Sequence, residues 1–284
     1  RTPTAVIYYF VKSKEGKPVR MCLAHRLSTQ LQNESIMWKE AAEPSTITAG
    51  EMVGSYEAWD GGYTGAGQRI AIIDTGIDLD HPSFDAGAFG YGRKMTQQKS
   101  GYKAEAGELL NVQEIAKVFG KLKASSKGAG KSPKNLYKNK KIAFAFNYAG
   151  DNLNVDSGSG DHGTHVAGIA AANQYVPAGD GKYRLQRDGV VGIAKDAQLL
   201  VMRVFDGSDE AFSDDYMAAV EDALLLGADV VNLSMGTPNP GESEAFSGEE
   251  FVNQVFQRLL DSDMVVSVAA GNYGSWAESS SVGH

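Results

Sequence analysis

The sequence predicts an α/β protein whose mainly parallel sheet is covered by helices on both faces. From Gly65 onward, short apolar runs alternate with helical patterns, and the connections between them are short. These runs are continuously apolar, which indicates strands buried on both faces. The 284 residues are enough to bury a large core. Since no stretch approaches the roughly 18 uninterrupted apolar residues of a membrane helix, we expect no membrane span.

The strands and helices of this sheet can be placed in order along the chain. The predicted strands cover residues 69–74, 197–204, 229–235 and 264–270. Before the third strand, Ser213 is a candidate N-cap followed by Asp214 and Asp215 in the first turn, and Gly227 ends the helix. A second helix is predicted to open at Ser247, and its apolar face carries Phe251, Val255, Phe256 and Leu259. In such sheets, binding sites form at the carboxyl ends of the strands.

Two segments stand outside the alternating pattern. Residues 1–45 contain one predicted strand at 5–11 and are interpreted as a propeptide tail or an N-terminal extension. Residues 85–141 form a Lys-rich insertion in which a helix is predicted around 105–119. Residues 121–139 are low in complexity, and we expect them to be mobile.

Charge is concentrated in the insertion. The chain has a formal net charge of −8, but residues 93–141 hold 13 basic and 3 acidic side chains. Such a segment could contact nucleic acid, yet a solvated surface is the favoured interpretation, so we do not expect a nucleic-acid partner. The single cysteine, Cys22, excludes an internal disulfide.

Asp74 is the first candidate functional residue, because it ends the apolar strand 69–74. A carboxylate there is desolvated, and its burial is costly unless it accepts several hydrogen bonds. Orienting a histidine is one way to satisfy it. Binding a metal or a ribose is another, and both alternatives stay open on this motif alone.

His162 is the second candidate, within Asp161-His162-Gly163-Thr164-His165-Val166-Ala167-Gly168. The small residues predict a helix that passes very close to the sheet; they are Gly163, Ala167, Gly168, Ala170 and Ala171. Such a helix would hold His162, at its start, against a neighbouring strand. Two histidines three residues apart also suit a metal pair, but that interpretation needs a third ligand.

Asn272 is the third candidate. It follows the predicted strand 264–270 directly after Gly271, so its side-chain amide is placed to donate to a developing oxyanion. An asparagine in an ordinary turn is the alternative for this residue considered alone.

Taken together and in this order, the motifs closely resemble the subtilisin-like serine protease family, over roughly residues 65–274. The resemblance implies an incomplete three-layer subtilisin-like fold and a serine endopeptidase of extended protein or peptide substrates. It implies that Asp74 is the triad acid, His162 the general base and Asn272 the oxyanion-hole amide. It also implies two walls that bind the substrate backbone: Ser234-Met235-Gly236 and Ala270-Gly271.

The serine of the triad is not found in the sequence. The family places it in a Gly-Thr-Ser-Met-Ala type segment, and no serine here has that setting. We therefore expect the serine in the remainder of the gene product, beyond residue 284, and expect this chain alone to be inactive. A pseudoprotease used as a surface-binding module is the alternative function, although the presence of Asp74, His162 and Asn272 together argues against it.

The separation of 88 positions from Asp74 to His162, with the segments 140–148 and 191–204, resembles the lactocepin-type cell-envelope proteinases. This branch implies a secreted or cell-wall location. It also implies that residues 46–284 are the first part of the catalytic domain and that a protease-associated domain follows. The chemistry requires no cofactor. A structural calcium ion is compatible with the acidic loops 151–161 and 206–215, but its site is unknown, and Ser83 replaces the acid of one family calcium site.

Overall fold

The structure is a computed structural model, and it divides the chain into two compact units. It describes residues 8–12, 18–22, 50, 52–100, 109–128, 132–156, 161–186, 189–207, 211–235, 257–259 and 261–269. The larger unit comprises residues 44–231, and the smaller one comprises residues 1–43 and 232–284. No helix of the described residues is long and apolar enough to cross a membrane.

The larger unit is built on the predicted parallel sheet. Strand β3 (Arg69–Asp74) pairs in parallel with β7 (Gln198–Arg203), and β7 pairs in parallel with β4 (Ile142–Asn147). On the other side of β3 lies β8 (Val230–Leu233). The register places the last residues of three strands, Asp74, Arg203 and Asn147, side by side at one edge of the sheet.

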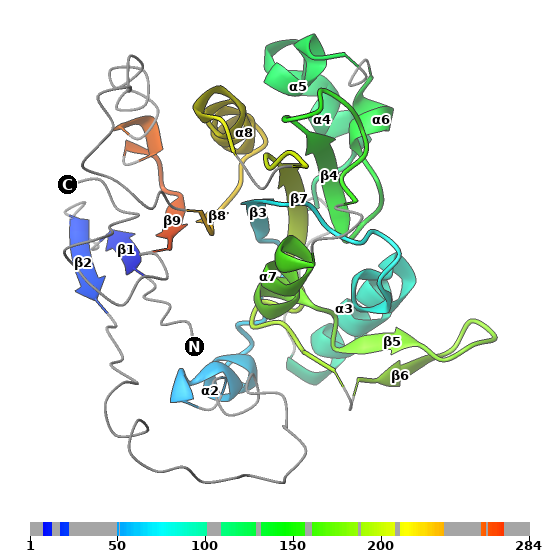
Figure 1. Ribbon diagram of the computed structural model, residues 1–284. Helices are drawn as coiled ribbons and strands as arrows, with labels where there is room; N and C mark the ends of the chain where they lie inside the picture. The colour runs from blue at the N-terminus through cyan, green and yellow to red at the C-terminus, as the bar shows by residue number, and fades with distance from the viewer. Residues whose placement is uncertain are drawn as a thin grey trace, which may run out of the picture. The chain divides into compact units, whose positions relative to one another are not determined.

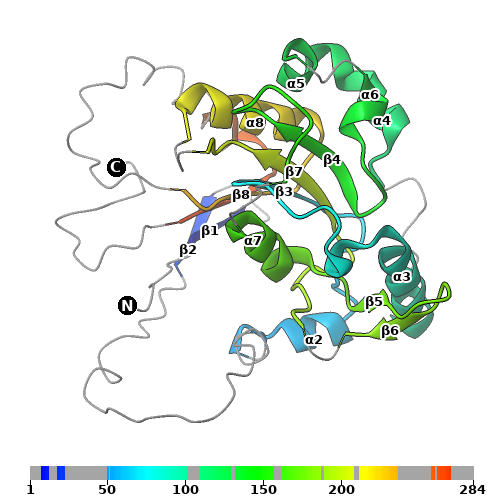
Figure 2. The same ribbon diagram turned by 45° about the vertical axis from the view of Figure 1, so that its right-hand side comes forward.

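Helices cover both faces of this sheet, as the sequence predicts. Helix α7 (His162–Ala171) packs against β3 and β7, and α8 (Ser213–Leu225) packs against β3 from the opposite face (Figure 2). Both faces of the sheet are apolar, since every residue of β4 is buried and β7 is exposed only at its end. The α/β class and the mainly parallel sheet are therefore confirmed.

The start of α8 differs from the prediction by one residue. Ser213 is the first helical residue, the N-cap is Phe212, and no side chain caps the helix. The end agrees, because Gly227 takes a positive φ of 66° just after the last turn. The second predicted helix, from Ser247, lies mostly outside the described residues; only 257–259 of it are described, and they are helical.

The Lys-rich insertion is more ordered than predicted. It contains α3 (Ala86–Ser100), α4 (Val112–Val118), the 3-10 helix η3 (Phe119–Lys121), α5 (Lys123–Ser126) and α6 (Pro133–Leu136) (Figure 1). Leu122, Ala124 and Leu136 are buried. The expectation of a mobile, solvated segment at 121–139 was wrong for the described residues, because these apolar side chains pack inward between the lysines.

Lys141 contradicts the solvated interpretation most clearly. Its side chain is fully buried, and Nζ donates to the carbonyl oxygens of Ala197 at 2.7 Å and Lys195 at 3.2 Å. The ammonium also lies 4.7 Å from the ring centre of Phe89 on α3. Burial lowers the pKa of Lys141 to about 7. From composition alone, Lys141 was assigned to the charged surface, whereas in the structure its ammonium group is a buried hydrogen-bond donor.

The remaining elements are short. Helix α2 (Ser55–Asp60), the 3-10 helix η1 (Pro82–Phe84) and the hairpin of β5 (Tyr175–Pro177) with β6 (Tyr183–Leu185) belong to the larger unit. In the smaller unit, β1 (Tyr8–Lys12) and β2 (Pro18–Cys22) form an antiparallel hairpin. Also in the smaller unit, the end of β8 neighbours β9 (Val265–Val268), where Ala269 N donates to Leu233 O at 3.0 Å.

Candidate active site

Asp74 is buried at the carboxyl end of β3, with 1% of its side chain exposed. One carboxylate oxygen, Oδ1, accepts a 2.7 Å hydrogen bond from the backbone N–H of Thr75. The other, Oδ2, has no hydrogen-bond partner in the described part of the chain. A buried carboxylate with an unsatisfied oxygen is costly, and a cationic partner beside it offsets that cost.

His162 is the first residue of α7, and two glycines bring this helix start against the end of β3. A Cβ atom on Gly163 would lie 2.1 Å from the carbonyl oxygen of Gly76, a distance no side chain can occupy. Gly76 itself has φ 108°, and a Cβ there would lie 2.1 Å from the carbonyl oxygen of Val155. The close approach predicted from the small residues is confirmed at Gly163. At Gly168 it was wrong, because a Cβ there would meet nothing within 4 Å.

Hydrogen bonds to two threonine side chains, Thr75 and Thr164, connect the first turn of α7 to the segment after β3. Gly163 N–H donates to Thr75 Oγ1 at 3.0 Å, and Asp78 N–H donates to Thr164 Oγ1 at 2.9 Å. The first bond satisfies a helix N–H that no local cap reaches, because the side chain of Asp161 makes no capping bond. These two bonds, at the residues that directly follow His162, fix the start of α7 and with it the position of His162.

The imidazole of His162 meets the carboxylate of Asp74, with Nδ1 and Oδ1 2.7 Å apart. Since an ionised carboxylate can only accept, the proton of a neutral imidazole resides on Nδ1. The other nitrogen, Nε2, then carries a lone pair, and it has no hydrogen-bond partner within the described residues. The side chain is 55% exposed. The site therefore presents a proton acceptor to solvent and a buried carboxylate behind it.

The surroundings of His162 make its imidazole easier to protonate than that of a free histidine. The hydrogen bond to Asp74 raises the pKa of His162 above its ordinary 6.5, burial opposes this, and the charges of Asp74 and Asp161 add to the increase. The histidine is thus a stronger base than a free imidazole, and the imidazolium that forms on proton uptake is stabilised by the carboxylate.

The other predicted site residues lie in the smaller unit or outside the described residues. Ser234 and Met235 follow β8 in the smaller unit, where Asn232 Nδ2 donates to Ser234 Oγ at 2.8 Å. Four more predicted residues lie outside the described residues: Gly236, Ala270, Gly271 and Asn272. Their assigned roles stay predictions.

A cleft beside α7 was not predicted from the sequence. It has a volume of about 1010 Å³ and is lined by Thr164, His165 and Gly168 of the helix, which follow His162. The other residues that line it include Asp78, His81, Asp156, Arg184 and Gln186. The sequence signal that could have indicated this cleft is the position of His165, three residues after His162 in the same motif.

No metal centre is found in the part of the chain that the structure describes, where no group of three or more His, Cys, Asp or Glu side chains could hold an ion. Among these described residues, His162 and His165 do not meet the third ligand that the metal-pair interpretation needs. Asp151 and Asp215, from the acidic loops considered for calcium, instead pair with Lys127 at 2.8 and 3.0 Å. Ser83 is buried, and its hydroxyl contacts Gln186 Oε1 at 3.3 Å.

Arg203 is a residue near the site that sequence reasoning missed. It pairs in register with Asp74, and its Nη1 donates to the carbonyl oxygen of Asp156 at 2.6 Å. This bond holds the segment before His162 beside the end of β3. Arg203, at the end of its strand, belongs to no recognised motif, so the sequence did not indicate its role.

Fold and geometry together define an α/β protein that carries an oriented histidine–carboxylate pair at the carboxyl edge of its parallel sheet. Comparison with known families gives the specific assignment: the model of the subtilase family matches residues 65–283. The chain belongs to the subtilase family.

Individual relatives fall into several branches of proteinases. The chain is 29% identical over 238 residues to the PI-type proteinase of Lactococcus lactis subsp. cremoris, covering 82% of this chain and 11% of that protein. It is 27% identical over 236 residues to the minor extracellular protease Vpr of Bacillus subtilis, covering 83% and 22%. Subtilisin amylosacchariticus is 27% identical over 224 residues, covering 78% and 39%. The chain thus spans about a tenth of the length of the lactococcal proteinase, and the predicted resemblance to that branch is confirmed.

Proposed function

We propose that this chain carries the acid–base half of a serine endopeptidase that hydrolyses peptide bonds of extended protein substrates. The observation that carries the proposal is the 2.7 Å contact between Nδ1 of His162, whose side chain is 55% exposed, and Oδ1 of the buried Asp74. Membership of the subtilase family supports the same reaction.

In the proposed mechanism, His162 Nε2 accepts the proton of a serine hydroxyl as the serine attacks the substrate carbonyl. The same nitrogen then returns the proton to the leaving amine. Asp74 holds the imidazole in the required tautomer and stabilises the imidazolium between the two transfers. Asn272 would donate to the oxyanion of the tetrahedral intermediate.

The serine would be contributed by the remainder of the gene product, since the family's serine motif does not occur in these 284 residues. Residues 46–284 would then be the first part of the catalytic domain, with residues 1–45 as propeptide tail or extension. The substrate backbone would pair with 234–236 and 270–271. On its own, this chain would be inactive.

We also propose that the enzyme works outside the cell or at the cell wall. The names of the relatives support this, since one is called an extracellular protease. The chemistry uses only side chains and backbone groups, so it needs no cofactor, while a structural calcium ion would serve stability alone.

The test is peptide hydrolysis by the full-length gene product and two histidine variants. His162→Ala should lower kcat by at least about 10⁴-fold, because the general base is lost. His165→Ala is the matched control: it lies three residues along the same helix without contacting Asp74, and it should retain kcat within a few-fold. Equal activity of the two variants would contradict the assignment. An inactive but folded wild type, with or without residues 1–45, would favour the pseudoprotease alternative.

A further inference from the structure

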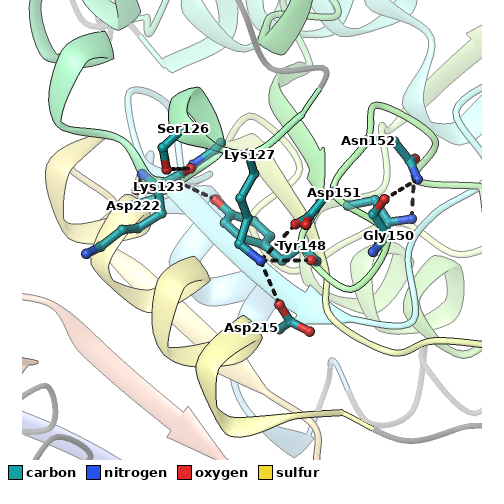
Figure 3. Close-up of polar contacts among 11 residues, drawn as sticks. Lys123, Ser126, Lys127, Tyr148, Gly150, Asp151, Asn152, Asp215 and Asp222 are labelled. Atoms are coloured by element: carbon teal, nitrogen blue, oxygen red, sulfur yellow. Dashed lines mark hydrogen bonds and ion pairs between the residues drawn. The ribbon is translucent and has the colours of Figure 1, made fainter.

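Lys127 stands at a junction of three elements that the catalytic assignment does not use. It follows α5 directly, and its Nζ lies 2.8 Å from Asp151 Oδ1 and 3.0 Å from Asp215 Oδ1. The same nitrogen donates to the carbonyl oxygen of Tyr148 at 3.3 Å. Figure 3 shows this single ammonium group between α8, which carries Asp215, and the turn after β4, which carries Asp151.

The turn after β4, residues 147–152, needs such external support. Asn147 and Asn152 close it by exchanging backbone hydrogen bonds of 2.9 and 3.1 Å. Within it, Asp151 has φ 52°, in the left-handed region that costs a residue with a Cβ about 1 kcal/mol or more. A fixed ion pair to its carboxylate favours this conformation over competing ones. Lys127 therefore stabilises the turn at Asp151, the residue whose backbone conformation is least favourable.

Three residues beyond this turn, Val155 contacts the segment that follows β3. Val155 is fully buried, and its carbonyl oxygen accepts a 2.8 Å hydrogen bond from Ile77 N–H. That oxygen also lies against Gly76, at the position a Cβ would occupy. Gly76 in turn touches Gly163 and follows Thr75, which binds Gly163 N–H. A continuous series of contacts thus joins the turn to the start of α7.

The burial of one partner, Asp215, makes the lysine difficult to replace, although the side chain of Asp151 is 55% exposed. Asp215 has only 11% of its side chain exposed, while that of Lys127 is 26% exposed. Burial raises the pKa of Asp215, and the hydrogen bond and charge of Lys127 oppose this increase. For Lys127, burial lowers the pKa, but the hydrogen bonds to Asp151 and Asp215 outweigh it and the net change is upward. The cation is therefore retained at neutral pH.

We propose that Lys127 is a positioning residue for the active site: by joining Asp151 to Asp215, it fixes the turn 147–152 and, through Val155, the junction of Gly76 with the start of α7. The proposal rests on the proposed function, because the effect on catalysis exists only if Asp74 and His162 are the reacting pair. It assigns a role in the reaction to a part of the Lys-rich insertion.

Lys123 provides a matched control on the same short helix. Its Nζ pairs with Glu221 Oε2 of α8 at 3.0 Å, so it joins α5 to α8 just as Lys127 does. It makes no contact with the turn 147–152. A purely structural role in holding α5 on α8 would therefore give Lys123→Met and Lys127→Met similar effects, whereas positioning of the turn affects only the second.

The experiment compares Lys127→Met, Asp151→Asn and Lys123→Met in the full-length protein, by peptide hydrolysis and by hydrogen exchange. Lys127→Met and Asp151→Asn should each lower kcat/KM by about 10-fold, since small displacements of reacting groups cost 10- to 100-fold. Lys123→Met should change kcat/KM less than 2-fold, and Lys127→Arg should restore most of the loss. Amides of residues 148–156 and 163–165 should exchange faster in the first two variants, and not in Lys123→Met.

Two additions to the experiment give a clear outcome even if Lys127→Met folds poorly or the wild type is inactive. If Lys127→Met folds poorly because Asp215 is left buried and unpaired, the double variant Lys127→Met/Asp215→Asn removes that charge and should still show the loss of kcat/KM and the faster exchange. An inactive wild type would defeat the proposed function, and exchange at 148–156 and 163–165 would still decide the positioning role. Wild-type kcat/KM and exchange in Lys127→Met, or equal effects in Lys123→Met, would overturn the inference.

Discussion

Two carboxylates of the larger unit are buried: Asp74 at the carboxyl end of β3, and Asp222 on α8. Asp74 meets α7, and its partner His162 keeps half of its side chain exposed. Asp222 is on α8, and its partners are enclosed: it accepts from Tyr148 Oη at 2.8 Å and from the backbone N–H groups of Lys123 and Ala124 at 2.7 and 2.9 Å (Figure 3). Burial alone does not distinguish a catalytic carboxylate from a structural one. The difference lies in whether the partner can exchange a proton with a reactant.

The two helices are also attached differently. Helix α7 can approach the end of β3 closely because Gly163 and Gly76 have no side chains, so their backbones are in direct contact. Helix α8 is attached by side chains, since Asp222 and Asp215 both reach across to groups of the Lys-rich insertion. Close backbone contact leaves His162 little freedom of position, whereas side-chain contacts hold a supporting element in place.

The largest effect expected from this comparison is on catalysis. Asp74→Asn should lower kcat by about 10⁴-fold, because an amide donates to Nδ1 and so fixes the wrong tautomer of His162. The variant should also lower the pKa of His162, since the carboxylate is the main cause of its increase. Asp222→Asn, at an equally buried position, should change kcat less than 10-fold. Peptide hydrolysis by the full-length variants measures both, and comparable losses would contradict the division of roles.

The next effect concerns stability. Burial raises the pKa of Asp222 from 3.8 to about 6, although its three hydrogen bonds oppose the increase. Between these pH values the folded state binds this proton more tightly than the unfolded chain, so the contribution of Asp222 to stability falls as the pH rises. The loss should reach about 3 kcal/mol by pH 7.

Urea unfolding of wild type and Asp222→Asn, at pH 4 and pH 7, tests this sign. The free energy of unfolding of the wild type relative to the variant should decrease between the two pH values. A relative stability that increases with pH would show that the three donors outweigh the burial of Asp222.

An effect of similar size is expected at the glycines of α7. Gly163→Ala should destabilise the protein by about 3 kcal/mol and reduce activity, because the new Cβ displaces α7 from Gly76. Gly168→Ala, in the same helix and facing open space, should stabilise it by about 0.5–1 kcal/mol with unchanged activity. Thermal unfolding and kcat of both variants check the pair. Equal tolerance of both substitutions would mean that close backbone contact does not position His162.

The sequence predicted the elements whose signal is local. The run Arg69–Asp74 matches β3 residue for residue, because a continuous apolar run ending on a carboxylate needs no distant information. His162 at a helix start followed similarly from the run of small residues after it. The family assignment followed from motifs in order, each of which lies within a few residues of chain.

The sequence could not predict contacts that join distant segments. Lys141 looks like surface charge until the carbonyl oxygens of Lys195 and Ala197, more than 50 residues away, are brought to it. Gly163 and Gly168 look equivalent in the motif, and only the position of Gly76 distinguishes them. Lys127 gave no signal at all, because its partners lie in two other elements, the turn 147–152 and α8.

The most direct test of the central claim is fluorophosphonate labelling of the full-length gene product, with peptide mapping of the adduct. The account predicts a label on a serine outside residues 1–284, lost in His162→Ala and retained in His165→Ala. The isolated 284-residue chain should take no label. A label on a serine within residues 1–284, or labelling that survives His162→Ala, would contradict the assignment of His162 and Asp74 as the acid–base pair of a serine supplied from elsewhere in the protein.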